Sequence, residues 1–379
     1  MKSDATGRYL PREFLSQIAP FISRKGPRNL LEISRNLSIP YQTLRYRMQQ
    51  LKRQGITVSP IVDTSRIGLR RVRASFKLHS DVQEKHLRSF FGSLYQAAGL
   101  HYYARSHFSN VFDSEFMVSE RNIAELSRIL QALEEMNLIS NLSMSELVWK
   151  EMLMMKTQYY DYERGQWDVD YSSLKIDPSL SNPPAPTQRQ VPSNNERDFD
   201  HVDLLIIKSL QINPWAKVLD ISKQIGVSQA ETMYHFHKHV HERRQISGYE
   251  FMWIGSKDAW AKHAIIGLTL IFREQQTDAN LRNAIAIATA LPFAWNHMLT
   301  ERGAYMAELL IPIYDYPEVM KYLSEKIRTL DLCTPELVFP DWSCCSNYTI
   351  PYSIHSAERG WSIEAEKSVS NILQTISIY

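Results

Sequence analysis

The chain is poor in cysteine and has no long apolar run. Its only thiols in 379 residues are Cys333, Cys344 and Cys345, too few and too poorly spaced for a disulfide framework or a four-cysteine metal site. No stretch of about 18 uninterrupted apolar residues occurs, so no segment is expected to span a membrane. The opening residues, MKSDATGRYLPREF, lack the apolar core of a secretory signal. We therefore expect a cytoplasmic protein.

The sequence also lacks an excess of charge of either sign. Lys and Arg number 43 and Asp and Glu number 41, so the formal net charge is only +2. A nucleic-acid surface would therefore have to come from local clustering. Residues 41–73 provide such a cluster, in which the single acid Asp63 faces these basic side chains: Arg45, Arg47, Lys52, Arg53, Arg66, Arg70, Arg71 and Arg73.

Signatures of catalysis are missing as well. The sequence shows no nucleophile triad, no glycine loop that could cradle a phosphate, and no carboxylate pair placed for acid–base work. It therefore predicts no catalytic residue and no cofactor, and we favour no metal site.

Two short helices joined by a tight turn are predicted within residues 30–56, LLEISRNLSIPYQTLRYRMQQLKRQGI. The apolar period of the first helix ends at Ser38-Ile39-Pro40, and that of the second restarts at Leu44, Met48 and Leu51. Gly55 stands where a helix C-cap belongs. The opposite face of the second helix is polar and basic. This pattern is typical of a helix-turn-helix, whose second helix enters the major groove of DNA.

The helix-turn-helix occurs twice. Residues 219–236, LDISKQIGVSQAETMYHF, align without a gap with residues 31–48. The identical pairs are Leu31/Leu219, Ile33/Ile221, Ser34/Ser222 and Tyr46/Tyr234. A small signature also recurs downstream of each copy, as ERGQW at 163–167 and ERGW at 358–361. We infer a tandem duplication.

Strand and helix patterns follow each helix-turn-helix in the order β-α-β-β-α-β, which is the ferredoxin-like split motif. The predicted fold class is therefore α+β, with two winged helix-turn-helix domains and two ferredoxin-like domains in tandem. Residues 57–62 are expected to form the first wing strand, and residues 66–71 the wing tip and its return. The predicted boundaries are 13–72 for the first winged helix, 73–173 for the first ferredoxin-like domain with its tail, 174–197 for a proline-rich linker, 198–258 for the second winged helix and 259–379 for the second ferredoxin-like domain with its tail.

This order of domains resembles the leucine-responsive regulator (Lrp/AsnC) family of archaea and bacteria. The segments ISRNLSIPYQTLRYRMQQLKRQGI and DISKQIGVSQAETMYHF carry the resemblance, which covers almost the whole chain, twice. It implies an archaeal-type, nucleoid-associated transcription regulator that binds double-stranded DNA. In that family the ferredoxin-like domains self-associate and often bind a small effector, commonly an amino acid. This chain would be a covalent pseudo-dimer that reads two half-sites.

The family often carries a glycine-acid turn before the third strand, near the effector. The first copy has Phe108-Ser109-Asn110 at this turn, and the second has Arg302-Gly303-Ala304. Neither keeps both the glycine and the acid, which argues against an amino-acid effector.

The second helix of the first copy is the predicted DNA reader. Gln42, Arg45, Tyr46 and Gln49 form one stripe, with Tyr41 beside it. Arginine can pair with guanine and glutamine with adenine. We expect further basic side chains to hold phosphates: Arg47, Lys52, Arg53, Arg70 and Arg71.

The second copy is a weaker reader. Met233 replaces Arg45 there, while Gln229 and His237 stay on the equivalent stripe. Lys238 and Arg243 could still reach phosphates.

Four histidines alternate in the same helix, at positions 235, 237, 239 and 241. His235 with His239, or His237 with His241, has the i, i+4 spacing of a divalent-metal chelate. We favour the other interpretation, in which surface histidines gain charge below pH of about 6.5 and strengthen phosphate contact.

Two alternatives to sequence-specific DNA binding remain. A winged helix can also serve as a scaffold that binds the transcription machinery or chromatin without reading a sequence. The same two-domain layout also resembles siroheme decarboxylases, whose strand pair carries His and Arg residues for the carboxylates of the tetrapyrrole. His101, Tyr102, Arg105 and His107 are similar to that set, whereas the second copy has only His297 and Arg302 nearby.

Overall fold

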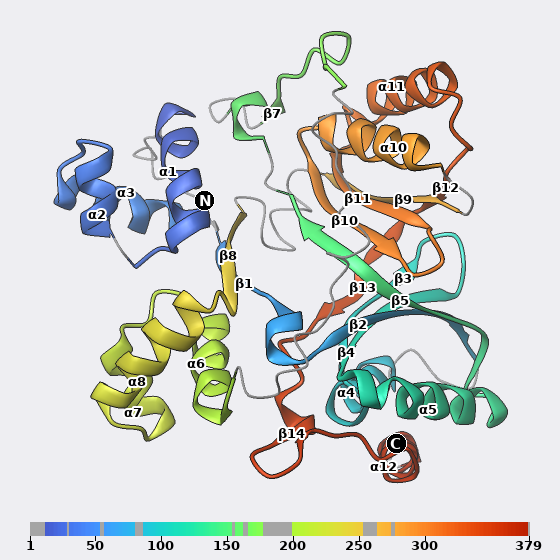
Figure 1. Ribbon diagram of the computed structural model, residues 1–379. Coiled ribbons are helices and arrows are strands. Elements are labelled where there is room, and N and C mark those ends of the chain that lie inside the picture. The colour runs from blue at the N-terminus through green and yellow to red at the C-terminus, as the bar shows by residue number, and fades with distance from the viewer. Residues whose placement is uncertain are drawn as a thin grey trace, which may run out of the picture.

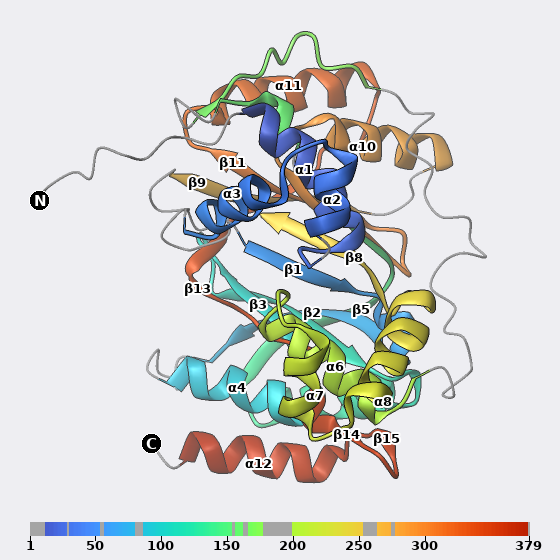
Figure 2. The same cartoon turned by 90° about the vertical axis from the view of Figure 1, so that its left-hand side faces the viewer.

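The structure is a computed structural model of the chain. It describes residues 12–28, 30–53, 57–79, 86–153, 156–161, 166–176, 199–252, 264–273 and 277–377. Gly55, residues 163–165 of the tail signature and most of the predicted linker lie outside the described residues. Figures 1 and 2 show the arrangement in two views at right angles.

The first winged helix consists of α1 (Arg12–Lys25), α2 (Leu30–Asn36), α3 (Tyr41–Arg53) and the strand β1 (Thr57–Val62). Leu44, Met48 and Leu51 form the buried stripe of α3, as their spacing predicts. At the turn, Ser38 adopts a positive φ of 53°, and the Ser34 hydroxyl donates to the Ile39 carbonyl (2.6 Å). These contacts fix α3 relative to α2.

The second winged helix repeats this layout with one change. It contains α6 (His201–Ile212), α7 (Val218–Ile225), α8 (Gln229–Tyr234) and the strand β8 (Ile246–Met252). The second helix of the helix-turn-helix continues beyond α8 as a π-helix, His235–Glu242. π-helical turns are rare and frequently lie at functional sites, so this segment differs from α3 in backbone geometry as well as in sequence.

Both ferredoxin-like domains have the predicted element order, except that the last strand of the second domain is divided in two. In the first, the elements are β2 (Arg70–Leu78), α4 (Leu87–Ala98), β3 (Leu100–Ser106), β4 (Val111–Val118), α5 (Ile123–Glu135) and β5 (Ile139–Met152). In the second, they are β9 (Ile265–Phe272), α10 (Asp278–Ala290), β10 (Ala294–Thr300), β11 (Tyr305–Pro312), α11 (Tyr316–Thr329), β12 (Glu336–Val338) and β13 (Pro340–Asn347). The α+β fold class with tandem winged-helix and ferredoxin-like domains is therefore confirmed.

The two ferredoxin-like domains pair within the chain. Nine of the described strands form one sheet in the order β12-β9-β11-β10-β5-β2-β4-β3-β13. The long strand β5 joins the halves, because it pairs with β2 up to Leu147 and with β10 from Leu147 to Met152. At the other end, β12 pairs with β9 while β13 pairs with β3. Only Phe339 separates β12 from β13, so the sheet closes on itself around an interior shared by both halves.

The wings are formed differently from the prediction. Thr57–Val62 has no return strand of its own; it pairs antiparallel with Ile246–Met252 of the second copy, from Thr57 opposite Met252 to Val62 opposite Ile246. Residues 64–67 form a 3-10 turn, and Arg70 already begins β2 of the central sheet. The expected wing tip at residues 66–71 is therefore wrong, because the sequence cannot show that β1 finds its partner almost two hundred residues away.

Packing crosses between the two copies. One core cluster combines Ile33, Leu44 and Met48 of the first winged helix with β9, β10, β11 and α10 of the second ferredoxin-like domain. The other combines Leu204, Ile207 and the other core residues of the second winged helix with β2, β4, α4 and α5 of the first. In Figure 1 each winged helix accordingly lies beside the other copy's sheet.

The tails cross in the same way. Trp167 of the first tail packs edge-on against Phe293 of the second copy, with ring centroids 5.8 Å apart. Leu174, expected to begin the linker, is buried in the same cluster. Trp361 of the second tail is buried against the first copy, and its indole N–H donates to the Ile67 carbonyl (2.6 Å). The last helix, α12 (Ala365–Ser377), packs against α4 and α5. None of the described helices is long and apolar enough to cross a membrane.

Candidate nucleic-acid interface and interior cavity

The polar face of α3 is open to solvent. Its predicted base-reading residues are all exposed: Tyr41, Gln42, Arg45, Tyr46 and Gln49. Lys52 and Arg53 at the end of the helix are exposed too. No described residue forms an ion pair with Arg45, Lys52 or Arg53, and α3 itself contains no acid. The helix therefore offers three exposed basic groups without a competing carboxylate along its length.

Three arginines of the predicted interface do not lie on the exposed face of α3. Arg47 is partly buried and its guanidinium lies over the Phe14 ring, 4.8 Å from the centroid. Arg70 and Arg71 are each only 15% exposed and belong to β2. Arg70 pairs with Glu120 and Glu146, and Arg71 pairs with Glu115. The burial and ion pairs of both arginines argue against the phosphate contact predicted for Arg70 and Arg71. Arg71 points into the interior of the sheet, whereas Arg70, the preceding residue of β2, lies on the opposite face with its two acids.

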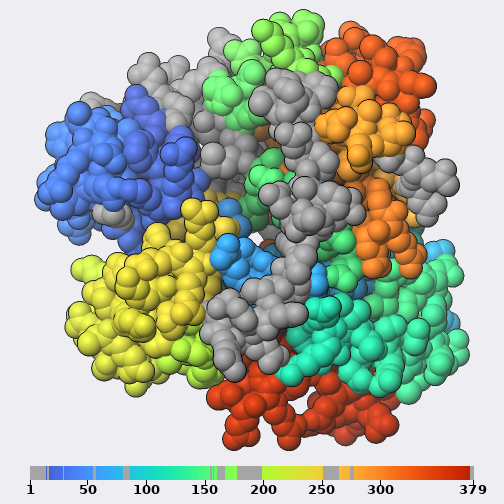
Figure 3. Space-filling view, in the orientation of Figure 1, coloured from blue at the N-terminus to red at the C-terminus, as the bar shows by residue number. Residues whose placement is uncertain are grey.

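The equivalent face of the second copy is exposed but carries less charge. Gln229, His237, Lys238 and Arg243 are exposed. Lys238, however, is held by Glu242 one turn away (2.9 Å), and burial together with Arg28 lowers the pKa of the neighbouring His241. Both winged helices adjoin on the same side of the molecule (Figure 3). Of the two reading helices on that side, α3 is the more basic.

The interior of the closed sheet contains a buried ionic cluster. Glu115 on β4 is 4% exposed; it accepts from Lys150 Nζ (2.7 Å) and pairs with Arg71. Burial alone would raise the pKa of Glu115, but Lys150 and Arg71 outweigh it and hold the pKa well below its ordinary value. Two residues beyond Arg71 on β2, Arg73 donates to Asp113 (2.6 Å). Alternate residues of β2 and β4 thus place charges inside the sheet, while their neighbours Val72, Ala74, Phe112 and Phe116 pack outwards against α4 and α5.

A cavity of about 540 Å³ opens beside this cluster. Its walls come from both copies: the wing strands β1 and β8, the inner side of β2, β3 and β5, and β10 and β11. Arg71 and Lys150 supply basic groups, whereas Asp63, Glu250 and Glu308 supply carboxyl groups. Burial raises the pKa of Glu250, although a hydrogen bond from Trp295 opposes the shift. A cavity with opposed charges and the apolar wall of Trp295 and Met152 suits a small polar molecule.

His101 and Tyr102 of the strand pair reach this cavity, but their two companions do not. Burial lowers the pKa of His101 to about 3, although Glu115 opposes the shift, so this imidazole is neutral near pH 7. Burial also raises the pKa of Tyr102, and Glu308 adds to the effect. Arg105 instead forms an ion pair with Asp341 (2.8 Å), and His107 is exposed at the end of the strand. The four-residue set is therefore divided between two places.

Several cavity residues escaped prediction from sequence. Lys150, Glu250, Trp295 and Glu308 belong to four different strands, and only the crossed pairing of the two copies brings them together. A signal existed in the alternation of Arg71 with Arg73 and of Asp113 with Glu115, which places like charges two residues apart on a strand. That alternation is also typical of a solvated strand face, so it did not identify an interior.

Comparison with known proteins identifies the fold. No protein-family model and no curated protein sequence matches the chain. The structure is similar to a solved structure of the siroheme decarboxylase NirDL, with a TM-score of 0.58, 13% sequence identity, and coverage of 96% of this chain and 99% of that chain. A second structure of NirDL, in complex with an iron-uroporphyrin III analogue, gives a TM-score of 0.54 and 14% identity over the same coverage. At this identity the similarity concerns the fold alone.

Proposed function

We propose that the protein is a DNA-binding transcription regulator that contacts the major groove mainly through α3. The observation that carries the proposal is the exposed, acid-free polar face of this helix. Gln42, Arg45 and Gln49 have donors suited to base edges, and Lys52 and Arg53 extend the positive charge towards a flanking phosphate backbone. The second winged helix adds a weaker contact on the same side of the molecule.

The interior cavity fits an effector role in this proposal. The wing strands β1 and β8 form one wall of it, through Ile61, Val62, Ser247 and Glu250. A small molecule bound there would touch the strands that connect both reading helices to the central sheet. Its two basic side chains and three carboxyl groups favour a zwitterionic or weakly cationic ligand over a polyanion.

The test is a titration of DNA binding by fluorescence anisotropy on a duplex selected from a random library by the full-length protein. Arg45→Ala should weaken binding to this duplex by roughly 1–3 kcal/mol, about 5- to 150-fold. Arg128→Ala is the control, since Arg128 is also an exposed arginine and lies on α5, where it pairs with Glu125, far from the winged helices in Figure 1. Identical losses for the two variants would contradict the proposal, as would failure of the wild-type protein to bind any duplex at low salt.

Salt dependence distinguishes this function from a scaffold that binds proteins. Several phosphate contacts make the affinity fall steeply with salt, with a slope of about 0.9 per phosphate neutralised. Lys52→Ala should reduce that slope by about one unit while leaving the preferred sequence unchanged.

An enzyme acting on a carboxylated tetrapyrrole is the second candidate. The similarity in fold to siroheme decarboxylase NirDL and the position of His101 beside Arg71 and Lys150 favour it. Against it, both cations already share Glu115, and a polycarboxylate would meet three further acids. The test of this candidate is to add siroheme to the protein and record the Soret band. A band that does not shift from that of free siroheme excludes the candidate.

A further inference from the structure

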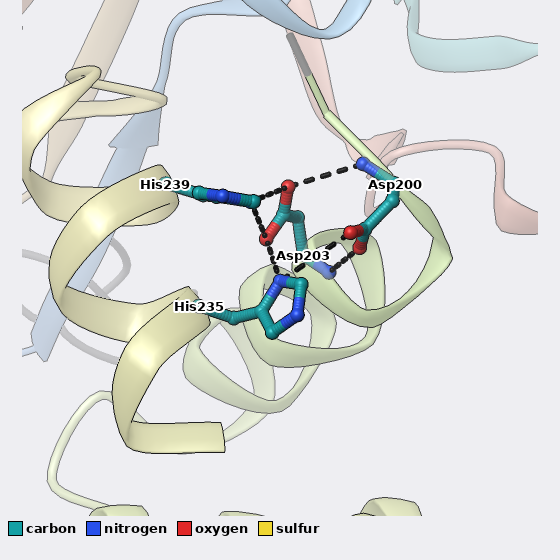
Figure 4. Close-up of side chains that lie close together, drawn as sticks. All are labelled: Asp200, Asp203, His235 and His239. Carbon is teal, nitrogen blue, oxygen red and sulfur yellow. Dashed lines mark hydrogen bonds and ion pairs between the residues drawn. The ribbon is translucent and has the colours of Figure 1, made fainter. Parts of the chain in front are cut away.

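The histidines of the π-helix do not share one environment. His237 and His241 are exposed, whereas His235 and His239 turn towards α6 and are only 12% and 13% exposed. There they meet the fully buried carboxylate of Asp203 and the carboxylate of Asp200, which caps α6 (Figure 4). The structure thus selects one of the two i, i+4 pairs and adds two acids to it.

We propose that Asp200, Asp203, His235 and His239 bind a Zn²⁺-class divalent transition-metal ion. One ligand atom from each residue lies within 4.8 Å of the other three. Two imidazoles among the ligands favour zinc and its neighbours over Mg²⁺ and Ca²⁺, which prefer oxygen throughout. The assignment is independent of whether the protein binds DNA.

The capping box of α6 leaves the necessary oxygens free. Asp203 Oδ2 accepts the Asp200 backbone N–H (3.0 Å), and Asp200 Oδ1 accepts the Asp203 backbone N–H (3.0 Å). The remaining oxygens, Asp203 Oδ1 and Asp200 Oδ2, both face His235, and Asp203 Oδ1 also faces His239, whose Nδ1 contacts the cap oxygen Asp203 Oδ2 as well (3.0 Å). An ion bound through Asp203 Oδ1 and Asp200 Oδ2 would therefore leave the two oxygens of the helix cap in place.

Three of the separations between ligand atoms are close to those of a tetrahedral site, and all of them lie within 4.8 Å. His235 Nδ1 lies 2.9 Å from Asp203 Oδ1 and 3.4 Å from Asp200 Oδ2, and His239 Nδ1 lies 3.1 Å from Asp203 Oδ1. Bonds of about 2.0–2.1 Å at tetrahedral angles place neighbouring ligand atoms roughly 3.3 Å apart. Small adjustments of the side chains would accommodate the ion, with each imidazole carrying its proton on Nε2 instead of Nδ1.

The position of the site suggests a clamp. Asp200 and Asp203 lie at the start of α6, while both histidines lie on the continuation of α8. The ion would fasten these two helices of the second winged helix together. Asp200 is half-exposed and also borders a surface cleft of about 500 Å³, which gives the ion a route in from solvent and permits exchange.

The experiment measures zinc binding by the full-length protein, purified without a histidine tag and stripped with a chelator. Zn²⁺ competition against a chromophoric chelator should give one tight equivalent. His239→Gln should weaken binding by at least about 100-fold, because even an outer partner of a zinc ligand typically changes affinity 10–100-fold. The matched control, His237→Ala with His241→Ala, removes the other i, i+4 pair of the same helix and should retain the tight equivalent.

A second variant distinguishes the loss of a zinc ligand from a loss of folding. Asp200→Asn keeps the helix cap, since asparagine caps as well as aspartate, but removes a charged ligand; it should fold normally and bind zinc at least about tenfold more weakly. Zinc should also slow hydrogen exchange in α6 and residues 229–242 of the wild-type protein. Absence of a tight equivalent in the wild type overturns the proposal. So does equal loss of zinc in the His239 variant and in the control, or binding that Mg²⁺ matches.

Discussion

His101 is a neutral base placed beside three ionised groups. Glu115 favours the protonated imidazole, whereas Arg71 and Lys150 oppose it. Burial is the largest effect and keeps the imidazole uncharged. The ring contributes to the polar wall of the cavity without adding charge to it. Its protonation would place a third cation next to Arg71 and Lys150.

This position predicts a pH effect on stability. The pKa of His101 is about 3 in the folded protein and about 6.5 in an unfolded chain. Below pH 6.5 the unfolded state therefore takes up a proton that the folded state does not, and stability falls as the pH is lowered towards 3. Between pH 6 and 5 the wild-type protein should lose up to about 1.4 kcal/mol per pH unit more than His101→Gln. Urea unfolding at each pH measures this difference, and parallel curves for the two proteins would contradict it.

Individual side chains were predictable where they face solvent and not where they face the interior. The exposed stripe of α3 follows from helical period, because Leu44, Met48 and Leu51 fix which side is buried. The partner of Arg71 does not follow from local sequence: Glu115 lies 44 residues away. The sequence predicts a turn between two strands at residues 66–71, and a basic residue in such a turn is expected to face solvent. This expectation explains the DNA contact predicted for Arg70 and Arg71.

Among the elements, the second tail shows how one copy completes the other. Trp361 is 3% exposed within the core of the first ferredoxin-like domain. Its carbonyl accepts from Arg121 (2.8 Å) and Asn122 (3.0 Å). The tryptophan that ends each signature, Trp167 or Trp361, thus packs into the core of the opposite copy.

Trp361→Ala should lower the free energy of unfolding by about 3–5 kcal/mol, the usual cost of removing a buried tryptophan. The reason is the loss of a large apolar contact together with the hydrogen bond to Ile67. Phe108→Ala is the control, since this ring is 82% exposed and its loss should cost about 0.5 kcal/mol or less. Urea denaturation followed by circular dichroism gives both values; similar small losses would mean that the tail does not contribute to the core.

Element types were predictable from period and turn residues, whereas their partners were not. Alternation and amphipathic spacing predicted the strands and helices of both ferredoxin-like domains. The prediction of a wing within the first copy is wrong because the pattern of β1 indicates a strand but does not indicate whether its partner strand follows it or lies in the other copy. The split of the last strand at Phe339 was missed for the same reason, since β12 and β13 differ in partner and not in sequence pattern.

At the scale of the molecule, the duplication predicted from sequence forms one interlocked body. Each core cluster takes its winged helix and tail from one copy and its ferredoxin-like domain from the other. Repeated sequences indicate repeated domains, but identical apolar faces pack equally well in either combination. The crossed arrangement therefore had to be observed.

Crossed packing predicts the behaviour of the separated halves. A chain cut within residues 177–198 yields two pieces, and each exposes the faces of a winged helix and a sheet whose partners lie on the other piece. Expressed alone, neither half should unfold cooperatively; expressed together, they should co-purify as a 1:1 complex. A tag on one half and size-exclusion chromatography provide the measurement. Two halves that each fold as stable monomers would contradict the prediction.

The crossing also fixes when the protein can fold during its synthesis. Ile372 of α12 belongs to the same core as β2 and α4, so the first ferredoxin-like domain leaves the ribosome long before the helix that covers it. This core cannot close until α12 has been translated, and the other core cannot close until its second ferredoxin-like domain, up to Leu332, has been translated. The nascent first copy must therefore remain unassembled for most of translation, a period in which apolar strands are exposed to aggregation and to chaperones.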